Sequence, residues 1–264
     1  MKILKPGFIL DNYFRALTKA ENRALLLDYD GTLAPFKTER DKAIPYPDAI
    51  PILDNLIESD KCRVVIISGR RIDDLLPLLN LKNLPEIWGS HGWERLMPDK
   101  TYHVFDFGKQ AIKGLAEAEN WLVKEALQSR YENKPGCLAL HWRGLPDDEA
   151  KELSDKANEH WSPIAAGSGL EIHVFNNGVE LRASGRNKGY AVKKIISETG
   201  KCMITYMGDD YTDEDAFGAL NSTGLGVLVS DKLRETAAGL WVKPPDEMLD
   251  FLKMWEESVV GGEK

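Results

Sequence analysis

Short continuous apolar runs alternate with helical stretches along most of this 264-residue chain. Runs of this length fit strands buried on both faces, and their alternation with helices favours a parallel sheet covered by helices. The apolar runs lie at 23–28, 63–68, 86–90, 201–207 and 226–230, and the helical stretches at 47–59, 72–79, 188–198, 212–220 and 245–258. The sequence therefore predicts an α/β fold with a Rossmann-like core.

The middle of the chain has a different pattern. Residues 137–143 (CLALHWR) alternate between apolar and polar side chains, as half-buried strands do, and an amphipathic helical stretch covers 146–160. Two further strand candidates flank Asn176-Asn177-Gly178, a sequence typical of a hairpin turn. We therefore expect a separate α+β cap domain inserted into the core. The predicted division is a core of residues 1–104 and 184–264 and a cap of residues 105–183.

The charge and the apolar pattern of the sequence disfavour several functions. Asp and Glu outnumber Lys and Arg by 42 to 34, and the resulting net charge of −8 disfavours binding to nucleic acid or to an anionic membrane surface. No apolar run approaches the roughly 20 residues that cross a bilayer, and Pro6, Gly7 and Asp11 interrupt the N-terminus before a signal-like core forms. The three widely spaced cysteines indicate reduced thiols, so we expect a cytoplasmic protein.

The first candidate for chemistry is Asp28-Tyr29-Asp30-Gly31-Thr32-Leu33, directly after an apolar run. In open α/β sheets the ligand site lies at the carboxyl ends of the strands, where these two aspartates fall. Two carboxylates this close repel each other and need a cation or a shared proton. Thr32 offers a hydroxyl and an N–H group to an oxyanion. The alternative interpretation is an ordinary turn after a strand, stabilised by the aspartate side chains.

A second acidic cluster, Gly208-Asp209-Asp210-Tyr211-Thr212-Asp213-Glu214-Asp215, also follows an apolar run. In an ordinary structural role, one or two of its carboxylates would cap the following helix, because acidic residues favour helix N-termini. The cluster holds five carboxylates within seven residues, which is more than capping requires. Hard carboxylate oxygens at two strand ends of one sheet suit Mg²⁺, so we expect this cofactor.

Two further segments fall at positions suited to a phosphate group. Ser68-Gly69-Arg70 ends the second apolar run, where a hydroxyl and backbone N–H groups either hold phosphate oxygens or form a plain turn. Lys188 opens a predicted helix, and a cation there opposes the helix dipole. A role in neutralising the aspartate pair and a phosphoryl group explains this placement.

These segments, in this order, resemble the four motifs of the haloacid dehalogenase-like phosphatases. A wider set of motifs is similar to the trehalose-6-phosphate phosphatase family: LLLDYDGTLAPF, ISGR, GSHGWE, LALHWR, VELRASGRNKG and GDDYTDEDAF. The resemblance extends from about Ala24 to Leu228, with the cap matched only at its short motifs. It implies a haloacid dehalogenase core with an α/β cap inserted between the second and third motifs.

The resemblance also implies a role for each motif residue. Asp28 attacks phosphorus and forms an aspartyl-phosphate, a covalent intermediate. Asp30 protonates the leaving sugar hydroxyl and then deprotonates the water that hydrolyses the intermediate. Ser68 and Lys188 hold the transferring phosphoryl group, and Thr32 assists through its N–H group.

The metal ligands follow from the same resemblance. The family pattern implies that Mg²⁺ is held by Asp28, by the main-chain carbonyl of Asp30 and by Asp209, with Asp210 and Asp213 nearby. The motif leaves open which of Asp210 and Asp213 contacts the ion directly.

Sugar recognition is expected from the cap and from the core loop beneath it. Glu180 shares a strand face with Arg182, and His141 shares one with Arg143, so these faces would form a polar roof over a disaccharide. An ordinary solvent-facing sheet surface is the alternative for His141 and Arg143. The two remaining candidates for substrate binding are Glu94, from the core side, and Arg70, as a sugar or phosphate contact or a surface residue.

The expected function is Mg²⁺-dependent hydrolysis of trehalose 6-phosphate to trehalose and phosphate. Ala183 and Trp142 depart from the proline and the tyrosine or phenylalanine common in this family, and both lie in the predicted cap. The alternatives are a capped phosphatase for sucrose phosphate or glucosyl-glycerate phosphate, a phosphomutase, and a non-catalytic phosphosugar sensor. The pathway of the family includes a trehalose-6-phosphate synthase as a candidate partner, which nothing in this sequence itself indicates.

Overall fold

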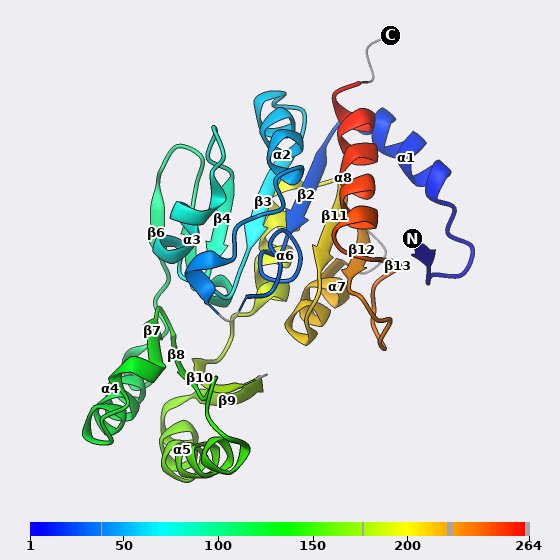
Figure 1. The fold of residues 1–264 in the computed structure, drawn as a ribbon. Coiled ribbons are helices and arrows are strands. Elements are labelled where there is room, and N and C mark those ends of the chain that lie inside the picture. Colours follow the sequence, from blue (N-terminus) through cyan, green and yellow to red (C-terminus); the bar gives the residue numbers. More distant parts are fainter. Residues whose placement is uncertain (38, 176, 221–223, 262–264) are drawn as a thin grey trace. The chain divides into compact units, whose positions relative to one another are not determined.

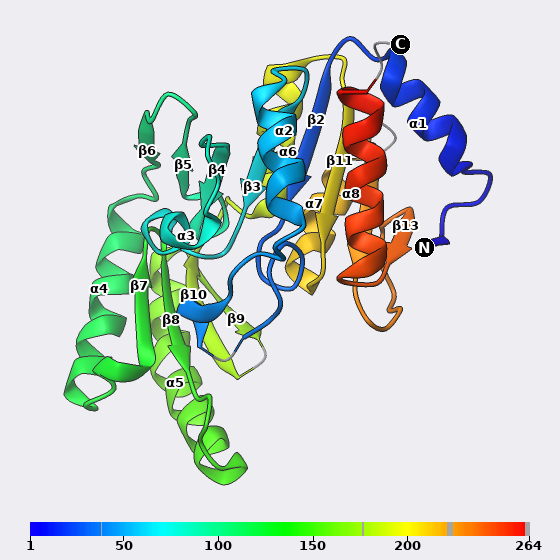
Figure 2. The ribbon, with the colours of Figure 1, turned by 45° about the horizontal axis from the view of Figure 1, so that its top comes forward.

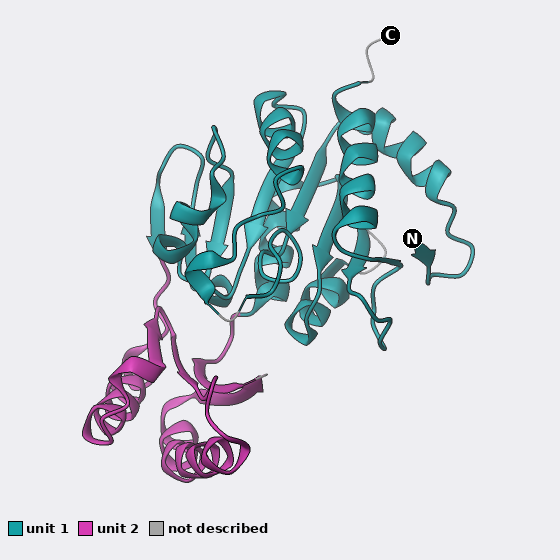
Figure 3. Cartoon of the chain, viewed as in Figure 1, with its two compact units in different colours: residues 1–103, 187–264 teal, residues 104–186 magenta. Residues whose placement is uncertain are grey.

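The chain divides into two compact units. The structure is a computed structural model that describes residues 1–37, 39–175, 177–220 and 224–261. One unit comprises residues 1–103 and 187–264, and the other comprises residues 104–186 (Figure 3). The larger unit is therefore assembled from both ends of the chain, and the smaller unit is the segment between them.

The larger unit is built on a single sheet. Its strands are β1 (Lys2–Ile3), β2 (Arg23–Leu27), β3 (Arg63–Ile67), β4 (Glu86–Gly89), β5 (Glu94–Leu96), β6 (Tyr102–Val104), β11 (Met203–Gly208), β12 (Gly224–Val229) and β13 (Leu240–Val242). Within the described residues their order is β1-β13-β12-β11-β2-β3-β4-β5-β6 (Figure 1). The strands from β13 to β4 in this order run parallel, whereas β1 pairs antiparallel with β13 and β5 pairs antiparallel with β4. The predicted α/β fold with a parallel sheet is confirmed.

Helices cover both faces of this sheet. They are α1 (Leu10–Lys19), α2 (Ala49–Glu58), α3 (Ile72–Leu79), α6 (Lys188–Thr199), α7 (Glu214–Leu220) and α8 (Asp246–Val259). Helix α8 packs against α1 and α2 on one face, and α6 packs against α7 on the other (Figures 1 and 2). The core under α8 includes nearly or fully buried side chains of Leu25, Leu27, Ile52, Phe251 and Trp255. The apolar runs form strands of a sheet that helices bury on both faces.

Helix α1 is an element that the sequence analysis did not predict. It buries Tyr13, Phe14 and Leu17, which recur at the spacing of one helical face, and leaves the opposite face exposed. The Tyr13 side chain reaches the sheet, where its hydroxyl forms a buried hydrogen bond with Thr205 Oγ1. The N-terminal segment is therefore part of the core unit.

The smaller unit is an antiparallel sheet with helices. Its strands are β7 (Tyr131–Lys134), β8 (Cys137–His141), β9 (Leu170–Phe175) and β10 (Gly178–Ala183), and its helices are α4 (Lys109–Lys124) and α5 (Asp147–Ser168). The strand order in the described part of this unit is β7-β8-β10-β9. Leu138, Leu140, Val179 and Leu181 are buried on the sheet, and both helices pack against it. The alternating pattern of the sequence thus produces a sheet with one apolar face.

One detail of this unit differs from the sequence prediction, and another involves a residue that the structure does not describe. Helix α5 continues through Pro163 to Ser168 instead of ending near His160, and Gly169, with φ of 70°, ends it. The predicted hairpin connects β9 and β10, but its first turn residue, Asn176, lies outside the described residues.

Among the helices that the structure describes, none combines the length and apolar character needed to cross a membrane.

Candidate active site

The two acidic motifs meet at the carboxyl ends of neighbouring parallel strands. Asp28 directly follows β2, and Asp209 directly follows β11. The Asp28 N–H group donates to the Met207 carbonyl at 2.9 Å, which extends the pairing of β2 and β11 beyond the strands. The sheet therefore brings together two segments that are far apart in the sequence, at the edge where ligands bind in α/β folds.

Lys188 places its ammonium group between two carboxylates of this cluster. Its Nζ lies 2.8 Å from Asp28 Oδ1 and 2.7 Å from Asp213 Oδ1, and its side chain is 4% exposed. Lys188 is the first residue of α6, and the Asn187 side chain caps this helix by accepting from the Tyr190 N–H group. The two carboxylates offset the unfavourable placement of a cation at a helix N-terminus. They also raise the pKa of Lys188 against the opposing effect of burial, so the side chain is charged.

Asp213 holds the acidic loop in place. Its Oδ2 accepts from the N–H groups of Asp209 at 3.0 Å and Asp210 at 2.9 Å. Its Oδ1 accepts from Lys188 and from the Tyr206 hydroxyl, and the residue is fully buried. These donors satisfy both carboxylate oxygens, so Asp213 fixes the loop and the lysine together.

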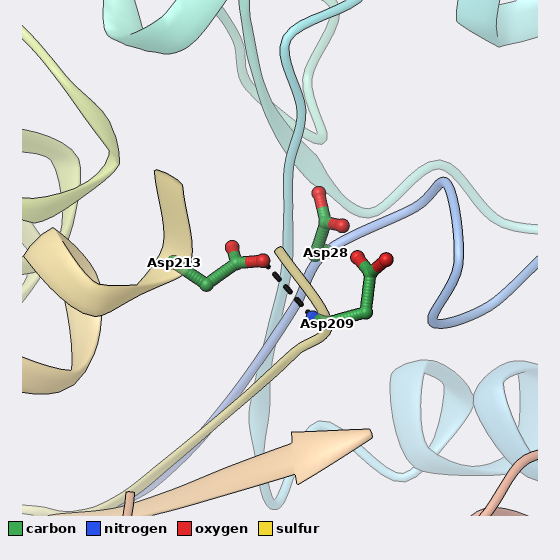
Figure 4. Close-up of side chains that lie close together, drawn as sticks. All are labelled: Asp28, Asp209 and Asp213. Atoms are coloured by element: carbon green, nitrogen blue, oxygen red, sulfur yellow. Dashed lines mark hydrogen bonds between the residues drawn. The ribbon is translucent and has the colours of Figure 1, made fainter. Parts of the chain in front are cut away.

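Asp28, Asp209 and Asp213 form a cluster that suits a divalent cation (Figure 4). One ligand atom of each lies within 4.8 Å of the others. Asp209 Oδ1 is buried and has no hydrogen-bond partner among the described residues, and the absence of a side chain at Gly31 leaves room for this carboxylate. When all three carboxylates are ionised, the single ammonium group leaves two negative charges uncompensated. Oxygen donors with this charge fit Mg²⁺.

The electrostatics of the cluster agree with that fit. Burial is the largest cause that raises the pKa of Asp28, opposed in part by Lys188. Burial also raises the pKa of Asp209 well above its usual range, and repulsion from Asp28 and Asp213 adds to this effect. The fully ionised cluster is therefore unfavourable by itself, and a divalent cation would stabilise it.

The position of Asp210 differs from that of its neighbours. Its side chain accepts from the Tyr211 N–H group and caps the short 3₁₀ helix η4 (Tyr211–Asp213). Asp210 is exposed and is not among the three clustered carboxylates of the described residues. Of the two residues whose roles the sequence left open, Asp213 lies in the cluster and Asp210 lies at its edge.

Asp30 lies beside the cluster and is bound by Arg70. Arg70 donates from Nε and Nη2 to the two oxygens of Asp30, each at 2.6 Å, and from Nη1 to the Arg40 carbonyl at 2.8 Å. The Arg70 side chain is 3% exposed, and that of Asp30 is 28% exposed. The sequence leaves Arg70 as a sugar or phosphate contact or a surface residue; its side chain is buried, and its guanidinium group binds the second aspartate of the motif.

Ser68 and Thr32 are the two hydroxyl candidates for a phosphate contact. Ser68 Oγ accepts from the Arg70 N–H group at 3.1 Å and is almost fully buried. Thr32 Oγ1 is buried and has no hydrogen-bond partner among the residues that the structure describes. The Thr32 N–H group donates to the Tyr29 carbonyl at 3.3 Å, which closes the turn after β2.

Glu94 is buried inside the larger unit. Its carboxylate accepts from the Ser90 hydroxyl and, at 2.7 Å, from the Tyr102 hydroxyl, and the residue is fully buried. Ser90 and His91, just before it, both have positive φ values, 48° and 56°. The His91 ring lies against Gly69, so this loop packs on the Ser68-Gly69-Arg70 motif. The sequence analysis did not single out His91.

Three of the predicted sugar-binding residues, Glu180, Arg182 and His141, lie on one face of the sheet in the smaller unit. The register places Glu180 opposite Ala139, Arg182 opposite Cys137, and Gly178 opposite His141. Directly opposed residues of antiparallel strands share a face, so Glu180, Arg182 and His141 lie on the same one. His141 Nε2 is 3.2 Å from Glu132 Oε1. Arg143 lies beyond the end of β8, and its carbonyl accepts from Arg130.

Strand β7 adds two charged residues that the sequence analysis missed. Glu132 and Lys134 lie opposite Ala139 and Cys137, on the same face as Glu180. Lys134 Nζ donates to Glu180 Oε1 at 2.9 Å, and Arg182 donates to the other oxygen of Glu180. The segment Tyr131–Lys134 has no apolar alternation, so nothing in its composition predicts a strand.

A family model described as trehalose-phosphatase matches residues 26–240 of this chain. The chain belongs to the trehalose-phosphatase family. Its α/β fold with a large parallel sheet agrees with the fold that the sequence resemblance implied. The match covers both acidic motifs, Lys188 and the whole of the smaller unit.

Individual proteins agree with this assignment to the trehalose-phosphatase family. The chain is 32% identical over 243 residues to a trehalose-phosphate phosphatase of Mycobacterium marinum. The alignment covers 86% of this chain and 60% of that protein. It is 30% identical to an uncharacterized glycosyl hydrolase of Mycobacterium tuberculosis over 90% of this chain. The chain spans 18% of the length of that protein, so it matches only part of these curated relatives.

A solved structure supports the fold of the trehalose-phosphatase family across almost the entire chain. The C-terminal domain of the C. albicans trehalose-6-phosphate phosphatase superimposes with a TM-score of 0.78. The match covers 97% of this chain and 99% of that domain, at 23% sequence identity. Both the larger and the smaller unit therefore have counterparts in a known fold.

Proposed function

We propose that this chain is a Mg²⁺-dependent phosphatase that hydrolyses trehalose 6-phosphate to trehalose and phosphate. The observation that carries the proposal is the position of the Lys188 ammonium group between Asp28 and Asp213. A phosphate ester is anionic, and a carboxylate can attack it only where nearby cations reduce the repulsion. Family membership and the clustered carboxylates support the same chemistry.

The first step forms an aspartyl-phosphate on Asp28. An oxygen of Asp28 forms a bond to phosphorus, and the bond between phosphorus and the sugar oxygen breaks. Asp30 gives a proton to that oxygen, which leaves as the sugar hydroxyl. For this transfer Asp30 must carry a proton and must exchange its hydrogen bonds with Arg70 for one with the substrate, because both its oxygens accept from Arg70.

The second step releases phosphate and restores the enzyme. Asp30, now a carboxylate, takes a proton from a water molecule, whose oxygen bonds to phosphorus while the bond to Asp28 breaks. Lys188 stays paired with Asp28 through both steps and stabilises the charge on the phosphoryl group. The Ser68 hydroxyl and Thr32, both buried in the motif loops that follow β3 and β2, are proposed to bind its oxygens.

The proposed metal ligands are Asp28 and Asp209, with Asp213 in the same cluster and Asp210 at its edge. The carbonyl of Asp30 is a further ligand that the family resemblance implies. When bound, Mg²⁺ supplies positive charge that favours approach of the phosphate and stabilises the charge developing on it. The chain contributes the orientation of these oxygens through Lys188, Asp213 and Gly31.

We further propose that the smaller unit, with boundaries near residues 105 and 183, recognises the sugar. Glu180, Arg182 and His141 lie on one sheet face together with Glu132 and Lys134. Carboxylates, cations and an imidazole on one face match the many hydroxyls of a disaccharide. Arg143, which lies two residues after the end of β8, is also proposed as a substrate contact. The same proposal includes Arg70 and Glu94 in the larger unit.

The same proposal places the protein in trehalose biosynthesis. Its three cysteines are free thiols, which supports a reducing compartment such as the cytoplasm. A trehalose-6-phosphate synthase, whose product would be the substrate of this chain, is the candidate partner in that pathway.

The test is phosphate release in the presence of Mg²⁺ from trehalose 6-phosphate, sucrose 6-phosphate and glucose 6-phosphate at matched concentrations. We expect strong preference for trehalose 6-phosphate and no release by Asp28→Asn, whose fold is checked by circular dichroism. Full activity of Asp28→Asn would remove Asp28 as the nucleophile.

Other outcomes of this assay identify the alternatives. Preference for sucrose phosphate or glucosyl-glycerate phosphate would keep the catalytic assignment and change the sugar. Formation of an isomeric phosphosugar without free phosphate would identify a phosphomutase. Binding of the phosphosugar with no turnover would identify a sensor.

A further inference from the structure

The connection between β12 and β13 carries a cation that contacts the acidic loop. Arg234 Nη2 donates to the backbone carbonyl of Asp210 at 2.8 Å and to that of Asp209 at 3.2 Å. Arg234 lies 25 residues after Asp209 in the sequence. The surrounding segment, SDKLRETAAG, has no motif character, so the sequence analysis did not identify this residue.

The acidic loop is thereby held through both polar groups of its backbone. Asp213 accepts from the N–H groups of Asp209 and Asp210, and Arg234 donates to the carbonyls of the same two residues. Backbone bonded in this way has little freedom to rotate, so the direction of the Asp209 Cα–Cβ bond is fixed. That direction matters because the Asp209 carboxylate fits in the space that Gly31 leaves beside Asp28.

Arg234 is itself held in position. Its Nη1 donates to Glu214 Oε1 and to the Glu235 carbonyl, and its guanidinium group lies 4.7 Å from the centre of the Tyr211 ring. The other carboxylate oxygen of Glu214 accepts from the Ala237 N–H group at 2.8 Å. Glu214, at the start of α7, thus fixes both the arginine and the backbone that follows it.

We propose that Arg234 is a positioning residue for Asp209 and that it sets the affinity of the Asp28, Asp209 and Asp213 cluster for a divalent cation. This proposal rests on the assignment of the cluster as the Mg²⁺ site in the proposed function. Groups that orient a metal ligand without touching the metal typically change metal affinity about 10- to 100-fold when they are removed. Arg234 acts through the backbone of Asp209, so its removal weakens binding without removing a ligand.

The experiment measures Mg²⁺ binding by isothermal titration calorimetry on the full chain without substrate. Arg234→Met should raise the Kd about 10-fold or more. Arg234→Lys should raise the Kd less, because an ammonium group keeps the charge but cannot hold Glu214 and two carbonyls in one plane. At saturating Mg²⁺ both variants should keep kcat within about twofold and an unchanged KM for the sugar phosphate, since no ligand is lost.

Two further variants distinguish the role of Arg234 from the assignment of the Mg²⁺ site on which it rests. Lys232→Met removes a cation from the same connection and should leave the Kd unchanged, which controls for a general loss of charge. Asp209→Asn should abolish Mg²⁺ binding, and normal binding by this variant would remove the metal-site assignment itself. Loss of binding in Asp209→Asn together with a wild-type Kd in Arg234→Met would overturn the role of Arg234 alone. Where Arg234→Met fails to fold by circular dichroism, a wild-type Kd in Arg234→Lys overturns the proposal.

Discussion

Arg70 binds both carboxylate oxygens of Asp30 through two parallel hydrogen bonds of 2.6 Å. Such a pair is among the stronger polar contacts in proteins, and the burial of the Arg70 side chain shields it from water. Arg70 also donates to the carbonyl of Arg40, so it ties Asp30 to the loop that follows the first acidic motif. The orientation of Asp30 therefore depends on a residue of the second motif.

We predict that Arg70→Met lowers the turnover of trehalose 6-phosphate about 10- to 100-fold, because general acid–base catalysis contributes about 10²- to 10⁴-fold and requires an oriented carboxylate. p-Nitrophenyl phosphate distinguishes the two steps, since its leaving group needs no proton. The initial burst of p-nitrophenol should persist, whereas steady-state turnover should fall. The matched control is Arg71→Met, which changes the partly exposed neighbour and should behave as wild type. Equal loss of burst and turnover in Arg70→Met would contradict this role of Asp30.

The proposed metal site leads to a prediction about thermal stability with and without Mg²⁺. In EDTA, Asp209→Asn should have a higher Tm than the wild type, because it removes one of three repelling carboxylates whose burial is unfavourable. Addition of Mg²⁺ at about 100 times its Kd should stabilise the wild type by about 2.7 kcal/mol and leave Asp209→Asn unchanged. Thermal unfolding with and without Mg²⁺ measures both effects.

Asp210→Asn is the matched control for that measurement. Its side chain is exposed and caps η4, and asparagine caps as well as aspartate does. This variant should therefore keep the stabilisation by Mg²⁺. A loss of stabilisation in Asp210→Asn equal to that in Asp209→Asn would place Asp210 among the ligands.

The sequence predicts the strands and the motif residues well because each depends on local pattern. The apolar runs before Asp28 and Asp209 form β2 and β11, and their pairing follows from the parallel topology. The strand ends then place the acidic motifs together without further information. The same reasoning placed Lys188 at the start of its helix.

The partners of these residues were not predictable in the same way. The contacts of Arg70 with Asp30 and of Arg234 with Asp210 join segments 40 and 24 residues apart, and no spacing rule relates them. Strand β7 was missed because its polar residues pair with β8 through backbone hydrogen bonds rather than through an apolar pattern. The sequence analysis does not predict helix α1, although its buried residues have helical spacing, because it considers the N-terminus only as a targeting segment.

The charged face of the sheet in the smaller unit leads to a prediction about specificity. Glu180→Gln should lower kcat/KM for trehalose 6-phosphate about 10-fold or more, because the change removes the charge of the carboxylate that accepts from Lys134 and Arg182 and alters the polar face. Turnover of p-nitrophenyl phosphate, which has no sugar, should stay within about twofold of wild type. The control is Glu171→Gln, an exposed carboxylate on the same sheet face. Parallel losses on both substrates would argue against a role in sugar recognition.

The last prediction concerns acid stability at the opposite ends of the strands. Glu198, near the end of α6, accepts from Arg95 at 2.7 and 2.9 Å and from Arg63 at 2.8 Å. The hydrogen bonds from Arg95 are the largest cause that lowers the pKa of Glu198 from 4.5 to about 2. A carboxyl with a lowered pKa in the folded state stabilises the fold above its unfolded pKa, and this contribution is lost as the pH falls from 4.5 to about 2.

Glu198→Gln should therefore lower the free energy of unfolding by about 1–3 kcal/mol at pH 7, allowing for solvent screening of a partly exposed pair. The difference from wild type should stay constant down to about pH 5 and shrink steadily below it, because the wild-type carboxylate then becomes protonated. Urea unfolding at pH 7, 5, 4 and 3 measures this difference. The control is Glu256→Gln on α8, whose carboxylate accepts from Asn55 instead of an arginine. A difference for Glu198→Gln that does not shrink below pH 5 would show that lost packing, not charge, causes the destabilisation.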